Sequence, residues 1–251
     1  MLTARQIKAL RYYIGDVSGN QPFWSNGKAY VVLNALFFPG IAAEVSRAAE
    51  GKYLDPELLS DTLRLEELLR DLLSAFQSCT VSSPVKTFRV ERMSDFSLCR
   101  SRKTTVSFTS TSTDGYLSSY SDRKGIALLE FLLHPGVPCI DVATELPHYA
   151  KPEEAEILLP PALCLDIEEA PLTEEHLAIK DSDGLPPQIR CVIRPSTILS
   201  PPERLERAVP EGSEAGMRVY EALNSGKRPS AEDITLYSNW KADFIANLFS
   251  V

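Results

Sequence analysis

The sequence lacks the features that mark several large classes of protein. It contains no Cys-x-x-Cys pair, and its five cysteines are scattered and odd in number, which argues against a disulfide framework. No stretch approaches the roughly 20 apolar residues that a membrane-spanning helix needs, and the N-terminus has no apolar signal core. We therefore expect no membrane partner, and a chain that is cytoplasmic or secreted by a specialised system without a conventional signal peptide.

Nucleotide and metal motifs are also missing. Neither Gly-x-Gly-x-x-Gly nor a P-loop occurs, so neither of the two common nucleotide-binding folds is supported. The three histidines and the cysteines do not have the spacing of metal ligands, so we expect no metal. One of these histidines, His176, is expected on the surface of a helix. The net charge of −8, without any run of Lys or Arg, argues against nucleic acid as a partner.

What the chain does contain is typical of a globular protein with a sizeable core. Its 251 residues, 44% hydrophobic and 24% charged, suit either one domain or one domain with an accessory lobe. The distribution of helix-like and strand-like patterns along the chain predicts three parts: a helical lobe over residues 1–80, a β-rich core over 81–200 and a helical extension over 201–251. Because helices and strands do not alternate, we expect an α+β fold with mostly antiparallel sheets.

Local signals define several elements. The clearest helix has Asp55 as its N-cap and Pro56 at its first position, and apolar residues then recur at helical spacing as far as Phe76. Near the C-terminus, Ser230 is expected to cap another helix, with Asp233 three residues on. Six stretches predict strands: KTFRVERM, KTTVSFTSTST, IALLEFLLHP, VPCIDVA, AEILLPPALCLDIEEA and PQIRCVIRPS.

Three short polar motifs are set in these strands. They are an arginine, Arg89, within Thr-Phe-Arg-Val; the run Phe-Thr-Ser-Thr-Ser, which contains Ser110 and Ser112; and the sequence Glu154-Ala-Glu156, which runs into Ile-Leu-Leu. Alternation in a strand would place Glu154 and Glu156 on the same face. Two like charges held together need a cation, a proton or a ligand between them, so this pair indicates a functional site.

In this order and spacing, the three motifs resemble those of the mono-ADP-ribosyltransferases. The similarity is to the arginine-serine-glutamate branch, which includes the catalytic chains of clostridial binary toxins and the vertebrate arginine-specific ectoenzymes. The helical lead-in of the bacterial members is also similar, with matching residues Tyr30, Leu33, Asn34 and Leu36. The resemblance covers roughly residues 8 to 165 and leaves the C-terminal helices outside it.

This resemblance implies a fold and an activity. The fold would be α+β and ADP-ribosyltransferase-like, with two roughly perpendicular, mostly antiparallel sheets that hold NAD in the cleft between them. The enzyme would transfer ADP-ribose from NAD to a protein side chain, with arginine as the favoured acceptor, and release nicotinamide. NAD is then a substrate, the partner is an acceptor protein, and the setting is that of a bacterial toxin or effector.

The resemblance also assigns roles to residues of the motifs. Glu156 would stabilise the oxocarbenium-like ribosyl cation and hold the ribose 2′-hydroxyl. Arg89 would bind the phosphates of NAD, Ser110 would orient Glu156, and Ser112 would support the strand. Glu154 would engage the guanidinium of the acceptor, because a fully protonated guanidinium is a poor nucleophile.

Two further residues complete the expected site, and alternatives stay open. Asn34 belongs to the expected NAD-binding set, and Tyr149, in the loop before the glutamates, is the aromatic expected to touch the target protein. Many relatives have Gly after the motif arginine, whereas this chain has Val90. The alternatives are an NAD glycohydrolase toxin, a non-catalytic module that binds NAD or a protein, and transfer to an acceptor other than arginine.

Overall fold

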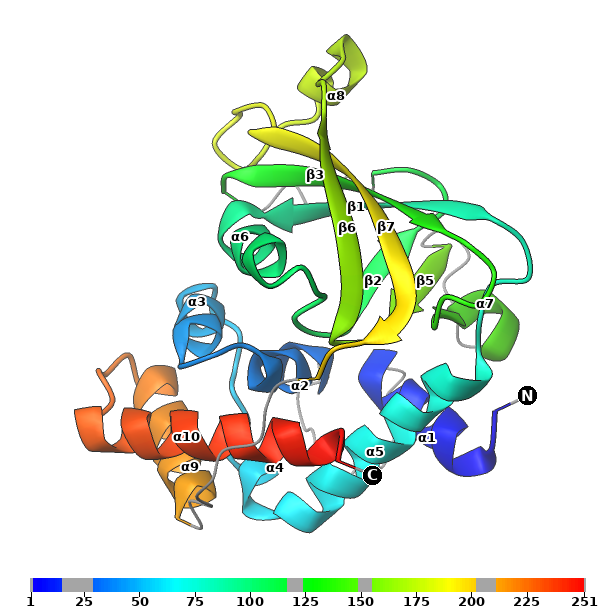
Figure 1. Ribbon diagram of the computed structural model, residues 1–251. Helices are drawn as coiled ribbons and strands as arrows, with labels where there is room; N and C mark the ends of the chain where they lie inside the picture. The colour runs from blue at the N-terminus through cyan, green and yellow to red at the C-terminus, as the bar shows by residue number, and fades with distance from the viewer. Residues whose placement is uncertain (1, 15–28, 117–123, 149–154, 202–210, 251) are drawn as a thin grey trace. The chain divides into compact units, whose positions relative to one another are not determined.

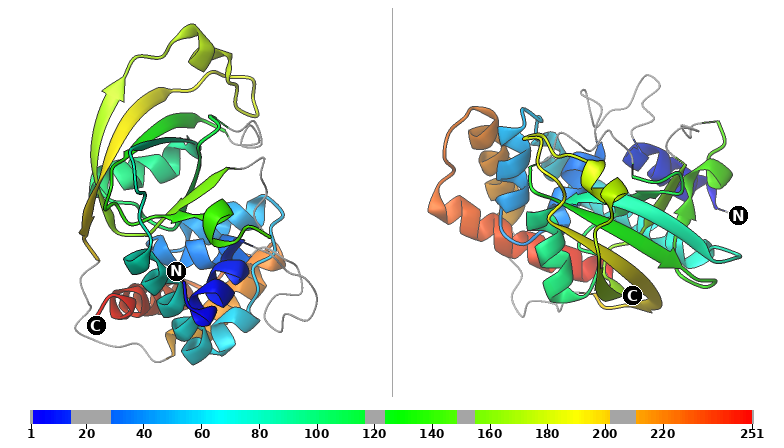
Figure 2. Two further views of the ribbon diagram at one scale, coloured as in Figure 1. Left: turned by 90° about the vertical axis from the view of Figure 1, so that its right-hand side faces the viewer. Right: turned by 90° about the horizontal axis from the view of Figure 1, so that it is seen from above.

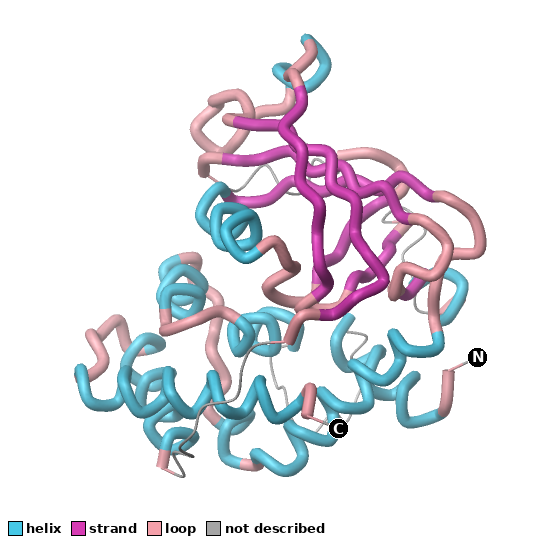
Figure 3. The backbone as a smooth tube through the Cα atoms, viewed as in Figure 1, coloured by secondary structure: helices cyan, strands magenta, loops and turns pink. Residues whose placement is uncertain are grey.

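The computed structural model describes residues 2–14, 29–116, 124–148, 155–201 and 211–250. Its internal contacts divide the chain into two compact units. The sheet unit comprises Met1–Leu2 and Ala75–Ser200, and the helical unit comprises Thr3–Ser74 and Pro201–Val251. All the strands that the structure describes belong to the sheet unit (Figure 3), so the α+β class is confirmed. The N-terminal and C-terminal helical segments, expected as separate parts, belong to one unit.

The described part of the sheet unit contains one sheet of seven strands in the order β4-β5-β2-β1-β3-β7-β6 (Figure 1). Neighbouring strands are antiparallel except β3 and β7, which are parallel. One predicted stretch yields both β5 and β6, because the chain turns between them at Ala162, whose φ is 62°. The strands are β1 Val85–Arg92, β2 Thr109–Ser112, β3 Ile126–Leu133, β4 Ile140–Asp141, β5 Glu156–Leu159, β6 Leu163–Ala170 and β7 Ile189–Leu199.

The resemblance implies two sheets, but in this structure they are joined into one continuous sheet at a narrow junction. β1 pairs with β3 along its whole length, but it meets β2 at the single registered pair Phe88 and Ser112. A three-stranded part, β4-β5-β2, therefore continues into a four-stranded part, β1-β3-β7-β6, through that one pair. The junction lies between the strands that carry the arginine and serine motifs.

Both faces of the sheet bury apolar side chains. The larger core cluster lies on the face that Phe96 of α6 (Met93–Arg102) covers, and Figure 2 shows this helix beside the strands. The smaller cluster, on the other face, contains Val90, Ile126 and Leu128. β3 is buried on both faces, which explains its nearly continuous apolar sequence. Two short helices complete the unit, α7 (Val142–Glu145) and α8 (Glu174–Ala178).

The helical unit departs from the prediction at Asp61. The helix expected from Asp55 to Phe76 is broken there, because Asp61 has φ −119° and ψ 75° and its carboxylate accepts a hydrogen bond from the Arg64 N–H at 3.1 Å. The predicted cap at Ser230 is confirmed, since its hydroxyl accepts from the Asp233 N–H at 3.0 Å. The described helices of this unit are α1 Ala4–Ile14, α2 Ala29–Phe37, α3 Ala42–Ala49, α4 Glu57–Ser60, α5 Thr62–Ser78, α9 Gly212–Asn224 and α10 Ala231–Leu248; the end of α5, from Ala75, is assigned to the sheet unit.

A buried ion pair joins the early and late helices of this unit. Lys241 Nζ of α10 lies 2.6 Å from Glu44 Oε1 of α3 and donates to the Ala35 carbonyl of α2 at 3.1 Å. The Tyr237 hydroxyl donates to the same Glu44 oxygen at 3.0 Å. Burial lowers the pKa of Lys241, and the nearby Glu44 carboxylate opposes that effect.

None of the described helices is both long and apolar enough to cross a membrane.

Candidate active site

The register between β2 and β5 brings the serine and glutamate motifs together. Ser112 lies directly opposite Glu156, and Ser110 lies opposite Leu158. Residues directly opposite in an antiparallel pair share a face, with Cβ atoms about 4.5–5.5 Å apart. Ser110 is therefore on the same face as Glu156 but two positions along the strand. The hydrogen bond expected between Ser110 and Glu156 stays a prediction, and Ser112 is the serine that the register places at the carboxylate.

Of the glutamate motif, the structure describes Ala155 and Glu156. β5 begins at Glu156, and Ala155 has φ 40°, a left-handed conformation that is uncommon for a residue with a Cβ atom. Its carbonyl accepts a hydrogen bond from the Thr113 N–H at 3.1 Å. The shared face that strand alternation predicted for the two glutamates stays a prediction. Both Glu154 and Tyr149 lie outside the described residues.

The motif arginine links β1 to β2. Arg89 Nη1 donates to the Ser110 carbonyl at 2.6 Å, and Arg89 Nε donates to Glu91 Oε2 at 2.6 Å. The side chains of Arg89 and Glu91 are each only 14% exposed. The guanidinium thus bridges the two strands next to Phe88 and Ser112, their single registered pair. The structure therefore brings the arginine and serine motifs into direct contact through a backbone carbonyl.

The remaining predicted residues have local partners. Ser112 is buried, and its hydroxyl accepts a hydrogen bond from the Asp114 N–H at 3.1 Å, which shapes the turn after β2. Asn34 lies in α2 of the helical unit, where its amide donates to the Tyr13 hydroxyl of α1 at 3.0 Å. Its part in binding NAD stays a prediction.

Sequence reasoning missed a buried carboxylate in the same sheet. Glu130 of β3 is 2% exposed, and it accepts from Arg190 Nε at 2.5 Å and from the Tyr116 hydroxyl at 3.2 Å. It also forms an ion pair with Lys86. Burial alone would raise the pKa of Glu130, but the hydrogen bonds from Arg190 and Lys86 outweigh it and lower the pKa to about 2. The sequence signal that could have indicated this site is the single glutamate in the apolar run IALLEFLL, because a charged residue in a buried strand needs a partner.

His176 also lies elsewhere than expected. The sequence predicts a histidine on the surface of a helix, and α8 does carry it. Its side chain is nevertheless only 15% exposed, with Nε2 3.6 Å from Glu130 Oε1. Its ring makes an edge contact with that of Tyr116. The tertiary fold turns this histidine toward the buried carboxylate.

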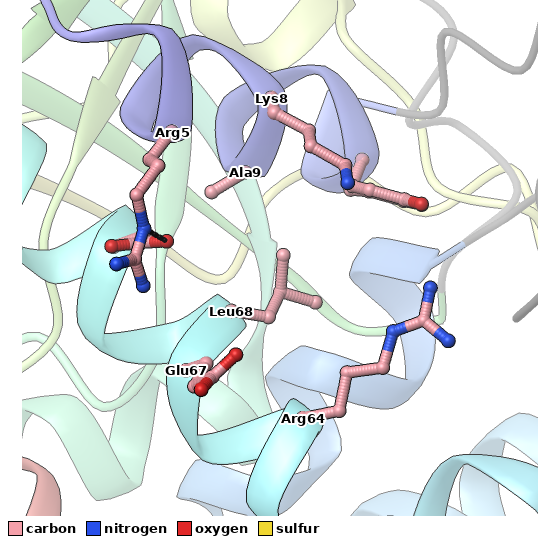
Figure 4. Close-up of a pocket in the computed structure, with 8 residues that line it drawn as sticks. Arg5, Lys8, Ala9, Arg64, Glu67 and Leu68 are labelled. Carbon is pink, nitrogen blue, oxygen red and sulfur yellow. Dashed lines mark hydrogen bonds and ion pairs between the residues drawn. The ribbon is translucent and has the colours of Figure 1, made fainter.

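Two hollows within the helical unit are lined by residues outside the predicted set. One, of about 240 Å³, is bounded by α1 and α5 and lined by Arg5, Lys8 and Arg64 among others (Figure 4). Arg5 Nε there lies 3.0 Å from Asp71 Oδ2. The other hollow, of about 540 Å³, is lined by α3 and by the turn between α9 and α10. Among the residues that the structure describes, no three His, Cys, Asp or Glu side chains are grouped so as to hold a metal ion.

Comparison with known proteins gives structural neighbours alone. No protein-family model and no curated protein matches the chain. One neighbour is the ADP-ribosylating toxin BECa of a C. perfringens binary enterotoxin, in a structure with NADH (TM-score 0.46, 15% identity, covering 78% of this chain and 44% of that one). A second is the enzymatic component C2-I of the C2-toxin from Clostridium botulinum, in a mutant form (TM-score 0.46, 17% identity, covering 78% of this chain and 43% of that one). A third is the ATR domain of SpvB from Salmonella (TM-score 0.44, 18% identity, covering 77% of this chain and 100% of that one). The chain spans less than half the length of the first two.

Proposed function

We propose that the protein is an NAD-dependent mono-ADP-ribosyltransferase that modifies a protein side chain, with arginine as the favoured acceptor. The observation that carries this proposal is the convergence of the motifs on three neighbouring strands. Arg89 of β1 contacts Ser110 of β2, and Ser112 of β2 is in register with Glu156 of β5. Segments far apart in the sequence thus place the three motifs on β1, β2 and β5, which are neighbours in the sheet.

These groups suit cleavage of the bond between nicotinamide and ribose. When that bond breaks, its electron pair leaves with nicotinamide and positive charge develops on the anomeric carbon of the ribose. In our proposal the Glu156 carboxylate stabilises this charge and binds the 2′-hydroxyl, as carboxylates do in glycoside hydrolysis. Arg89 binds the diphosphate, since a guanidinium donates several hydrogen bonds to phosphate oxygens. Ser110, Ser112 and Asn34 belong to the same NAD-binding set.

The second half of the reaction needs an acceptor. We assign Glu154 to the guanidinium of a target arginine, whose nitrogen must lose a proton as it bonds to the anomeric carbon. Tyr149 is assigned to contact with the target protein. In this scheme a side chain of the protein interacts with each charged group: the ribosyl cation, the diphosphate and the acceptor guanidinium. NAD takes part as a substrate. A toxin or effector role belongs to the same proposal.

The test uses NAD labelled in its adenylate part, a cell lysate and purified variants. Glu156→Gln keeps the shape of the side chain and removes its charge, so we expect nicotinamide release to fall by about 100-fold or more. The control is Glu168→Gln, an exposed residue of β6 that pairs with Arg194, and it should behave as wild type. Near-normal activity of Glu156→Gln would contradict the assignment.

Glu154→Ala separates transfer from hydrolysis. If arginine is the acceptor, this variant should lose the label on protein. Nicotinamide release without labelled protein, unaffected by the loss of Glu154, would instead identify an NAD glycohydrolase. NAD binding without either signal would identify a binding module.

A further inference from the structure

β1 carries three polar residues on the face that is turned toward the larger core. Thr87, Arg89 and Glu91 alternate along this strand, and the residues opposite them in β3 are buried members of the apolar cluster, namely Phe131, Leu129 and Ala127. Thr87 is fully buried, and its hydroxyl has no hydrogen-bond partner among the described residues. Burying a polar group costs free energy unless it is hydrogen-bonded, and Arg89 and Glu91 meet this condition by pairing with each other.

The carboxylate of Glu91 is fixed at both oxygens. Oε2 accepts from Arg89 Nε at 2.6 Å, and Oε1 accepts from the Arg92 backbone N–H at 3.0 Å. Arg89 is in turn held at Nη1 by the Ser110 carbonyl of the neighbouring strand. A guanidinium is planar, so restraints at two of its nitrogens define the direction of the whole group.

The surroundings strengthen this restraint. Cys99 of α6 lies near the pair. Burial is the main reason that its pKa rises to about 12, and the Glu91 charge raises the pKa further while the Arg89 charge lowers it. Hydrogen bonds between charged groups are stronger where water is scarce, so the largely buried Glu91 carboxylate orients Arg89 more firmly than a surface partner would.

We propose that Glu91 is a positioning residue, which holds the Arg89 guanidinium in the orientation that receives the diphosphate of NAD. This inference rests on the proposed function. The alternative effect of Glu91 is electrostatic, because a carboxylate beside an anion-binding arginine repels the anion. The two effects have opposite signs in a binding experiment, which makes them separable.

The first experiment compares Glu91→Ala with Glu91→Gln. Glu91→Ala removes the acceptor, so the KM and the Kd for NAD should rise at least about 10-fold while kcat changes less than about 3-fold. Glu91→Gln keeps a carbonyl oxygen that can accept from Nε, and its KM should stay closer to that of wild type. Glu168→Gln is the matched control. Tighter NAD binding by both Glu91 variants, or a lower Tm with unchanged KM, would overturn the inference.

A second experiment needs no NAD. The side-chain Nε–H of Arg89, assigned by its loss in Arg89→Lys, should give a slowly exchanging NMR signal in the wild-type protein. We expect that protection to disappear in Glu91→Ala and to persist in Glu91→Gln. An unchanged signal in Glu91→Ala would overturn the inference directly. If the Arg89 Nε–H loses protection in Glu91→Ala but the wild-type protein does not bind NAD, the proposed function is wrong, and the inference that rests on it is overturned as well.

Discussion

At the scale of single residues, the candidate site is marked by backbone strain at Ala155. A left-handed conformation costs a residue with a Cβ atom about 1–2 kcal/mol, and such strain gathers at functional sites. Ala155 lies between the two motif glutamates, and the hydrogen bond from Thr113 holds its carbonyl. The conformation directs the chain into β5 so that Glu156 starts the strand in register with Ser112.

This strain predicts the effect of two substitutions. Ala155→Gly should raise the free energy of unfolding by up to about 1 kcal/mol, because glycine adopts positive φ without a Cβ clash. Ala155→Val should lower it, since a β-branched residue is strongly disfavoured there. Urea unfolding measures both changes. Ala170→Gly, at the regular end of β6, is the control and should lower stability by roughly 0.5–1 kcal/mol. A destabilised Ala155→Gly would contradict this account.

At the scale of elements, Glu130 connects several parts of the sheet unit. Its carboxylate binds Lys86 of β1 and Arg190 of β7, and it also contacts Tyr116, after β2, and His176 of α8. Phe88 makes an edge contact with Tyr116 on the same side. One charged side chain of β3 therefore joins β1, β7 and α8 to Tyr116, which follows the serine motif.

The depressed pKa of Glu130 makes part of the stability depend on pH. The pKa is about 2 in the folded protein and near 4.5 when unperturbed, so ionised Glu130 stabilises the fold above pH 4.5. That contribution is lost as the pH falls from 4.5 toward 2. Glu130→Gln should be less stable at pH 7 by about 3 kcal/mol and should lose less stability between pH 4.5 and 3. Urea titrations at pH 7, 4.5 and 3 test this, and an equal loss in both proteins would contradict it.

At the scale of the whole molecule, the two ends of the chain build one unit. Arg70 Nη2 donates to the Asn247 carbonyl at 2.8 Å, and the Asn224 amide donates to the Leu54 carbonyl at 2.6 Å. Gly216 allows α9 to pack against α10, because a Cβ atom there would lie 2.5 Å from Tyr237. The C-terminal helices are thus structural partners of the N-terminal ones rather than a separable addition.

The ion pair between Lys241 and Glu44 tests this dependence. Lys241→Met leaves a buried carboxylate without its cation, so we expect a loss of about 3–5 kcal/mol in the free energy of unfolding. Adding Glu44→Leu to Lys241→Met should recover most of that loss, because replacing both charges with apolar groups is often neutral. Thermal and urea unfolding provide the measurement. A single variant as stable as wild type would show that the pair does not hold the unit together.

The local features of this protein can be predicted from its amino-acid sequence. Strand sequences, the apolar periodicity of helices and the cap at Ser230 depend on neighbours within a few residues, so they can be read without a fold. The sequence also located Arg89, Ser110, Ser112 and Glu156 in strands, because these polar motifs interrupt β-forming stretches. A helix such as α6 escaped detection because its ten serine- and charge-rich residues show little periodicity, and tertiary contacts through Phe96 hold it in place.

The contacts between residues far apart in the sequence follow from the tertiary fold. The β2–β5 register places Ser112 rather than Ser110 opposite Glu156, and a shift of one residue would have reversed every side chain. The partners of Glu130 come from strands and a helix far apart in the sequence. The contact of Arg89 with both Glu91 and Ser110 depends on how β1 and β2 meet at their single registered pair. These contacts arise from long-range strand pairing, which local propensity does not encode.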